Sequence, residues 1–168
     1  MFTPATAADS TTIHLRVRYA ETDAMGIVHH SRYLPWLEMA RTEFMRERGY
    51  TYRELEQAGV QLAVIEVQAR YRAPAVYDDP IAVTARLAEF GRVKLRFEYR
   101  VYNEATGRLL MEAETLHAFV GRNGQPVRMA SQYPEIWQRL QAIVSEVRRG
   151  EGGTDDGTAS AGGPPAHD

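Results

Sequence analysis

The residues best suited to chemistry lie together in one short segment, residues 19–34, which contains Asp23, Gly26 and His30. A carboxylate followed by a glycine and, about seven residues later, by a helix N-terminus brings an acid beside free backbone N–H donors and the positive end of a helix dipole. Such an arrangement can hold a carbonyl whose oxygen gains negative charge while the carboxylate attacks its carbon or activates water there. The segment therefore favours Asp23 as a catalytic carboxylate.

The same residues also fit a structural role. An aspartate in a loop commonly forms a turn, and a glycine there commonly satisfies the backbone. An aspartate is ionised at neutral pH, so Asp23 could act as a nucleophile without a partner, whereas a general base would benefit from partial desolvation. Spacing alone leaves the turn, the nucleophile and the general base open as roles for Asp23.

Several other catalytic devices are excluded by composition. The chain contains no cysteine, which excludes disulfides, thiolate metal sites and a cysteine nucleophile. His29, His30 and Glu38 could suggest a metal site, but adjacent histidines point apart in both strands and helices, and the His-Glu-x-x-His spacing does not occur. Neither a Gly-x-Ser-x-Gly elbow nor a phosphate loop is present. We therefore expect no metal ligands.

Two elements must position the segment. Residues 13–20 alternate between apolar and polar side chains, the period-two pattern of a strand with one buried face. After the segment, apolar residues recur at intervals of three and four and predict a long helix; they are Tyr33, Trp36, Leu37, Ala40 and Phe44. Ser31 is a candidate cap for this helix, and Gly49 closes it.

The remaining pattern predicts an α+β fold. A short helix or turn covers residues 52–58, and period-two alternation follows in residues 65–72, 81–87, 93–102 and 109–119. A further amphipathic helix begins after Pro134. Consecutive hairpins make the last strands antiparallel, and the long helix must cover one face of their sheet. We expect a five-stranded antiparallel sheet wrapped around one long central helix, plus a C-terminal helix.

The length of 168 residues and the hydrophobic content of 44% indicate one domain. Residues 13–149 form the predicted core, residues 1–12 a flexible N-terminus, and residues 150–168 a disordered tail, because the tail lacks large apolar side chains. The net charge of −2 provides no general positive field for nucleic acid or an anionic membrane. No secretion signal or membrane span is recognised, so we expect a cytoplasmic protein.

The loop and the start of the long helix resemble the signature of the 4-hydroxybenzoyl-CoA thioesterase family of hotdog proteins. The resemblance is strongest to its short-chain acyl-CoA thioesterase branch, which is associated with the Tol-Pal envelope system. The matching residues are Glu21, Thr22, Asp23, Gly26, Val28, His30, Tyr33, Glu38, Ala40 and Arg41. The order of elements from residue 13 to about residue 127 is also similar, which implies the hotdog fold for most of the core.

The resemblance implies roles for the residues of the loop. Asp23 would act as nucleophile or general base, and the backbone N–H of His30 would polarise the thioester carbonyl. The His30 side chain would orient water or Asp23. Gly26 would approach the substrate, and Tyr19 and Tyr33 would line the acyl pocket or the subunit interface.

The phosphates of coenzyme A require a second, basic site. Arg92, Lys94, Arg96 and Arg100 fall close together on the outward face of one predicted strand. A basic face on a solvated strand more commonly serves solubility. In the family this strand and the preceding turn lie near the nucleotide end of the ligand, so the resemblance selects Arg92 and Lys94. Coenzyme A is part of the substrate here, and no separate cofactor is expected.

These observations together predict an acyl-CoA thioesterase that releases CoA and a short-chain or aromatic acid. One alternative is a hotdog hydratase or dehydratase, whose His-x-x-Pro pattern is missing. Another is a non-catalytic acyl-CoA-binding module, against which the presence of Asp23 argues. A homodimer or a dimer of dimers (a homotetramer) is expected, because one helix on one sheet leaves apolar strand surface and edges uncovered, and family members place the active site between subunits.

Overall fold

The computed structural model describes residues 10–151, with the side chains of residues 10–146. Its main elements are β1 (Ser10–Arg16), α1 (Tyr33–Glu47), α2 (Tyr52–Gln57), β2 (Val60–Tyr71), β3 (Pro80–Phe90), β4 (Lys94–Asn103), β5 (Arg108–Gly121), α3 (Met129–Gln132) and α4 (Pro134–Glu151). Two short 3-10 helices, η1 (Tyr19–Glu21) and η2 (His30–Arg32), lie between β1 and α1. Most of the predicted N-terminal and C-terminal segments lies outside the described residues.

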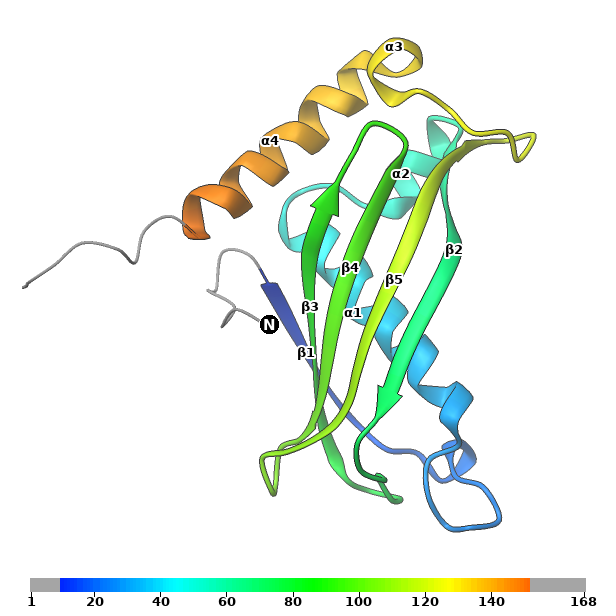
Figure 1. Cartoon of the computed structure of the whole chain (residues 1–168), viewed down its shortest axis with the longest axis vertical. Coiled ribbons are helices and arrows are strands. Elements are labelled where there is room, and N and C mark those ends of the chain that lie inside the picture. The colour runs from blue at the N-terminus through cyan, green and yellow to red at the C-terminus, as the bar shows by residue number, and fades with distance from the viewer. Residues whose placement is uncertain (1–9, 152–168) are drawn as a thin grey trace, which may run out of the picture.

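The five strands form one antiparallel sheet in the order β1-β3-β4-β5-β2. Helix α1 crosses one face of this sheet, and α4 lies at the end where β3 turns into β4 (Figure 1). The predicted α+β architecture, with a sheet wrapped around one long helix and a further C-terminal helix, is confirmed.

The core forms between α1 and the inward side chains of the sheet. All five residues of the predicted helical stripe are at most 2% exposed. The alternating burial along β4 places Phe97 and Tyr99 against the helix, and the rings of Phe44 and Phe97 meet edge to face with centroids 5.3 Å apart. Because α1 buries its whole apolar stripe, the sheet fixes the position of the loop that precedes it.

The far end of α1 also organises the first strand. Arg48 lies over the Phe44 ring at 3.5 Å and donates a hydrogen bond to Thr11 Oγ1 at 3.0 Å. Thr11 in turn donates to the Glu47 carboxylate. These contacts hold residues that the alternation pattern left out, so β1 begins at Ser10 instead of Ile13.

Strand β2 forms one edge of the sheet, and it exposes apolar side chains. A bulge interrupts its pairing with β5 between Val64 and Glu66. Val64, Ile65 and Val67 around this bulge are 48%, 48% and 43% exposed. An edge strand with unpaired backbone groups and exposed apolar side chains is suited to pairing with another chain.

Candidate active site

The segment between β1 and α1 forms a tight turn around Asp23. An isolated bridge joins Thr22 to Val28, the Asp23 N–H donates to Ile27 O at 2.9 Å, and the Gly26 N–H donates to Asp23 O at 2.9 Å. Gly26 has φ +75°, a left-handed conformation that residues with a Cβ rarely adopt. Gly26 is therefore required by the turn itself, whether or not a substrate approaches it.

The Asp23 side chain is half-buried, and its two oxygens have different surroundings. Its Oδ1 accepts a hydrogen bond from the Met25 N–H at 2.8 Å, which is a turn-forming contact. Its Oδ2 has no hydrogen-bond partner among the described residues. One oxygen thus fixes the orientation of the carboxylate, and the other remains available to attack a carbon or to accept a proton.

Glu21 anchors this turn to the core. It is 4% exposed, and its Oε1 accepts a hydrogen bond from Trp36 Nε1 at 2.9 Å. Its backbone carbonyl accepts from the His29 N–H at 2.9 Å. Burial opposes ionisation, but hydrogen bonds from Arg18 and Trp36 outweigh it and hold the pKa of Glu21 below its usual value. Sequence reasoning placed Glu21 in the motif without a role, because Trp36 is fifteen residues away.

His30 begins η2, so its backbone N–H has no acceptor within that helix. The peptide unit that carries this N–H is held through its own carbonyl, that of His29, which accepts from the Arg32 N–H at 2.9 Å. The next carbonyl, that of His30, accepts a hydrogen bond from the Tyr71 hydroxyl at 2.7 Å. The His30 side chain is exposed. His29 caps η2, because its Nδ1 accepts from the Ser31 N–H at 3.3 Å. The N–H of His30 is therefore a fixed donor in the same loop as Asp23.

The two predicted tyrosines have different surroundings. Tyr33 is 2% exposed and packs on Trp36 and Tyr71, with ring centroids at 4.8 Å and 5.4 Å. Burial raises the pKa of Tyr33. Tyr19 is 77% exposed, and its ring meets Tyr77 edge to face. Tyr33 supports the loop from beneath, whereas Tyr19 is free to contact a ligand or another subunit.

The predicted phosphate-binding residues lie far from Asp23 in the folded subunit. Arg92 and Lys94 are exposed near the turn between β3 and β4, at the opposite end of the sheet from the η1–η2 loop (Figure 1). Arg96 pairs with Glu114 at 2.9 Å. Within one chain, the structure does not bring Arg92 and Lys94 together with Asp23.

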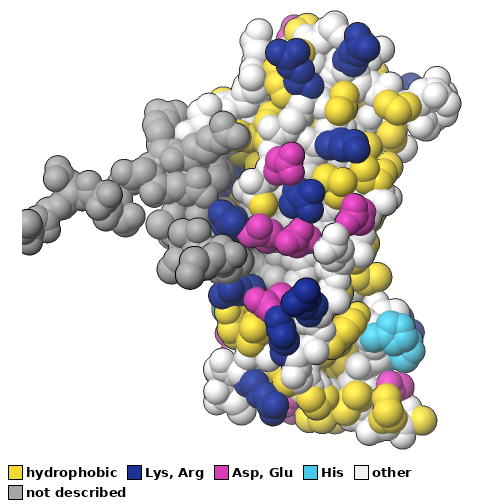
Figure 2. Space-filling view, viewed as in Figure 1, with side chains coloured by type: hydrophobic (Ala, Val, Ile, Leu, Met, Phe, Trp, Pro, Cys, Tyr) yellow, Lys and Arg dark blue, Asp and Glu magenta, His cyan; other side chains and the backbone are white. Residues whose placement is uncertain are grey.

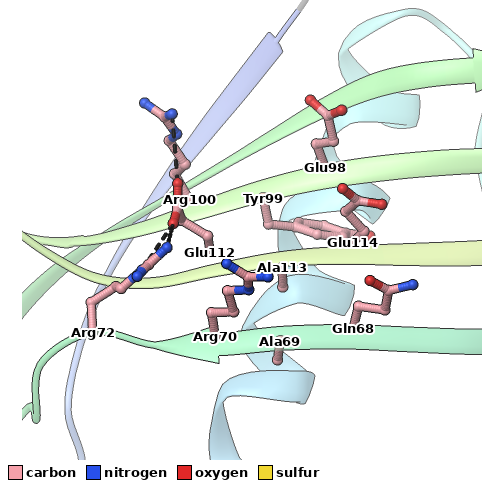
Figure 3. A pocket seen from close by; sticks show the side chains of 10 residues that line it. All are labelled: Gln68, Ala69, Arg70, Arg72, Glu98, Tyr99, Arg100, Glu112, Ala113 and Glu114. Carbon is pink, nitrogen blue, oxygen red and sulfur yellow. Dashed lines mark hydrogen bonds and ion pairs between the residues drawn. The ribbon is translucent and has the colours of Figure 1, made fainter. Parts of the chain in front are cut away.

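The outer face of the sheet carries a groove of about 660 Å³ lined by charged residues of β2, β4 and β5 (Figure 3). Positive and negative side chains are interspersed on this face (Figure 2). Arg72 pairs with Glu112 at 2.7 Å, and Arg100 lies 3.7 Å from the same carboxylate. These charges largely neutralise one another, and none of the predicted site residues lines the groove.

Sequence reasoning missed a polar chain inside the core. Tyr99 Oη lies 2.8 Å from Thr115 Oγ1, which lies 2.7 Å from His117 Nε2. Thr115 is 3% exposed and His117 is fully buried. The signal was present in the sequence, because both residues fall on the inward side of the alternation along β5.

Two further findings concern metals and membranes. Within residues 10–151, no group of three or more His, Cys, Asp or Glu side chains is arranged to hold a metal ion. None of the helices in this part of the chain has the length and apolar character needed to cross a membrane.

Comparison with known proteins identifies the family. A family model described as the thioesterase-like superfamily matches residues 17–142. YneP of Bacillus subtilis, named as a candidate acyl-CoA thioesterase, is 33% identical over 122 residues, which are 72% of this chain and 88% of YneP. The acyl-CoA thioester hydrolase YbgC of Escherichia coli O6:H1 is 35% identical over 102 residues, which are 61% of this chain and 75% of YbgC.

A solved structure shows the same fold. The DHNA-CoA thioesterase of Staphylococcus aureus aligns with a TM-score of 0.76 over 84% of this chain and 95% of that chain, at 23% identity. The resemblance predicted from the residues around Asp23 is thus confirmed at the level of family and fold. The chain belongs to the thioesterase-like superfamily and has the hotdog fold.

Proposed function

We propose that this protein is an acyl-CoA thioesterase that hydrolyses a short-chain or aromatic acyl-CoA to the free acid and CoA. The observation that carries the proposal is the pairing, in one loop, of an oriented carboxylate with a backbone donor. Asp23 is oriented by the Met25 N–H, and the N–H of His30 stands at the start of η2. The names of the relatives support the same reaction class.

The loop is held rigidly enough to serve as a catalytic site. Three contacts from distant elements fix it: Trp36 to Glu21, Tyr71 to the His30 carbonyl, and the Val28 N–H to Ala75 O at 2.9 Å. Donors that are already fixed stabilise a developing oxyanion without reorganising during the reaction. The contacts of Glu21 and Tyr71 thus position the groups that would act.

Two routes use these groups. In the first, an Asp23 oxygen attacks the thioester carbon, the C–S bond breaks, CoA leaves as thiolate, and water hydrolyses the resulting anhydride. In the second, Asp23 accepts a proton from water while that water attacks the same carbon. The C–S bond then breaks, the free acid forms, and CoA leaves and takes up the proton from Asp23. In both, the His30 N–H stabilises the carbonyl oxygen as it gains negative charge.

We further propose that the active unit is a homodimer, alone or within a dimer of dimers, formed by antiparallel pairing of two β2 strands. The exposed apolar side chains lie at the middle of β2, where a two-fold axis would bury them against their own copies. The axis would place Val60 opposite Tyr71 of the partner subunit. It would also carry the β3–β4 turn of one subunit, with Arg92 and Lys94, to the end that holds Asp23 in the other.

Replacing Asp23 by asparagine tests the chemistry. Asp23→Asn can keep the turn contact with the Met25 N–H while removing the charge. We expect kcat for CoA release to fall by at least ~10²-fold with little change in the melting temperature. A thiol-reactive dye can follow CoA directly, because the protein has no cysteine to react.

Asp79→Asn is the matched control, since Asp79 Oδ2 accepts from the Val76 N–H at 2.9 Å in a similar turn. Near-normal kcat in Asp23→Asn would refute the proposed role of the carboxylate. Addition of water to an enoyl-CoA without CoA release would favour a hydratase, and binding without any turnover a binding module. Light scattering that returned a monomer of 19.0 kDa would contradict the dimer.

A further inference from the structure

A second cavity, of about 440 Å³, lies between α1, α2 and the start of β2. Its walls are apolar on the β2 side, where Val60 and Leu62 contribute. Arg41 and Tyr52 line the opposite side, with Glu38 also at the wall. Thr42, Gln61 and a second carboxylate, Glu56, complete the polar part of the lining, so the cavity has an apolar wall and a polar wall, with Arg41 as its cation.

Arg41 is a partly buried cation in this cavity, and it has no ion-pair partner among residues 10–146. Its charge acts on Tyr52, Tyr99 and His117, so the guanidinium faces the buried polar chain. Glu38 stands three residues earlier on α1 but forms no ion pair with Arg41. Glu56 also lines the cavity, and neither carboxylate forms an ion pair with Arg41 among the described residues, so a ligand carboxylate that reaches the guanidinium can pair with it.

The hydroxyl of Tyr52 lies close to the Arg41 guanidinium, but its own proton has no acceptor among the described residues. Its oxygen is buried, and no hydrogen bond from it to the described residues is formed. Burial raises the pKa of Tyr52, so the hydroxyl keeps its proton and remains a donor. A buried donor without an acceptor carries an energetic penalty that a ligand oxygen would relieve.

In the proposed dimer the cavity would lie within reach of the catalytic loop of the second subunit. Arg41 is two turns along α1 from Tyr33, roughly 12 Å by helical rise, so the Asp23 loop of the same chain is distant. The proposed pairing of two β2 strands would place the cavity, at the Val60 end, beside the Tyr71 end of the partner strand. In each chain the Tyr71 hydroxyl holds the His30 peptide, so the loop that carries Asp23 accompanies that end of β2.

We propose that this cavity binds the far end of an acyl group that terminates in a carboxylate, with the Arg41 guanidinium and the Tyr52 hydroxyl as its donors. The inference rests on the proposed thioesterase function and names its substrate class. The methylene chain of the acyl group packs against Val60 and Leu62. The buried hydrogen bonds from Tyr99 through Thr115 to His117 support the wall that faces Arg41.

The test compares two substrates of the same shape, glutaryl-CoA and 5-methylhexanoyl-CoA, in which an isopropyl group replaces the carboxylate. We expect the wild-type protein to prefer glutaryl-CoA by at least ~10-fold in kcat/KM. Arg41→Met should lower kcat/KM for glutaryl-CoA by ~10- to 100-fold and leave 5-methylhexanoyl-CoA within about threefold. Arg53→Met, an exposed arginine of α2, should change neither and controls for net charge.

Tyr52→Phe provides an independent readout. The variant should lose part of the preference for glutaryl-CoA. Its melting temperature without ligand should stay the same or rise, because the lost hydroxyl donates no hydrogen bond to the described residues. Equal use of both substrates by the wild type, or an equal loss for both in Arg41→Met, would overturn the inference while leaving the thioesterase intact. Failure to release CoA from any acyl-CoA would instead overturn the proposed function, and the inference with it.

Discussion

His117 makes a specific prediction about stability and pH. Its imidazole is fully buried, Nε2 contacts Thr115, and Nδ1 has no hydrogen-bond partner among the residues that the structure describes. Burial, together with the positive charge of Arg41, lowers the pKa of His117 from 6.5 to about 4. The folded protein therefore keeps this histidine neutral in a pH range where the unfolded chain protonates it.

The sign and the size of the effect follow from proton linkage. Between pH 6.5 and about 4 the unfolded state binds a proton at this residue that the folded state does not, so the free energy of unfolding falls as the pH falls. The slope is ~1.4 kcal/mol for each pH unit, so lowering the pH from 6.5 to 5 should cost about 2 kcal/mol. The whole interval corresponds to about 3 kcal/mol.

Urea unfolding at pH 7, 6 and 5, at one protein concentration, measures this effect. His117→Gln can still hydrogen-bond Thr115 but does not titrate, so its stability should decline less with acidification than that of the wild type. The difference between the two slopes isolates His117 from the other histidines, and pH 5 stays above the range in which most carboxylates titrate. Parallel stability profiles for the two proteins would refute the inference that His117 is neutral in the folded state.

Two further predictions concern the loop. Glu21→Gln should destabilise the protein by about 1–3 kcal/mol, because it weakens buried hydrogen bonds from Trp36 and Arg18. The pKa of Glu21 is lower in the folded protein than its unfolded value of 4.5, so the stability that Glu21 contributes is present above pH 4.5. This stability is lost as the pH falls through the folded pKa, and the melting temperatures of wild type and variant should therefore converge in acid. Gly26→Ala should lower the free energy of unfolding by about 1 kcal/mol through the backbone alone, because φ is +75° and no described atom lies within 4 Å of an added Cβ. A chemical-denaturation midpoint equal to that of the wild type would contradict this prediction.

The sequence alone determined the features that depend on neighbours along the chain. The three- and four-residue spacing from Tyr33 to Phe44 predicted α1, and period-two alternation predicted the strands, because burial of one face imposes those periods. Asp23 and the start of the helix lie within one short segment, so their juxtaposition was also local. These signals, with the motif, were sufficient for the family and the fold.

Tertiary structure alone decided which distant groups meet. Alternation does not specify that β2 pairs with β5 and leaves its other edge bare, since strand order depends on long-range packing. The same holds for the contact of Glu21 with Trp36, and for the separation of Arg92 from Asp23. Arg41 and Tyr52 belong to different helices, and only the packing of α1 and α2 beside β2 brings them to one cavity. Desolvation, which gives those groups their chemistry, is a property of the folded arrangement and not of the residue types.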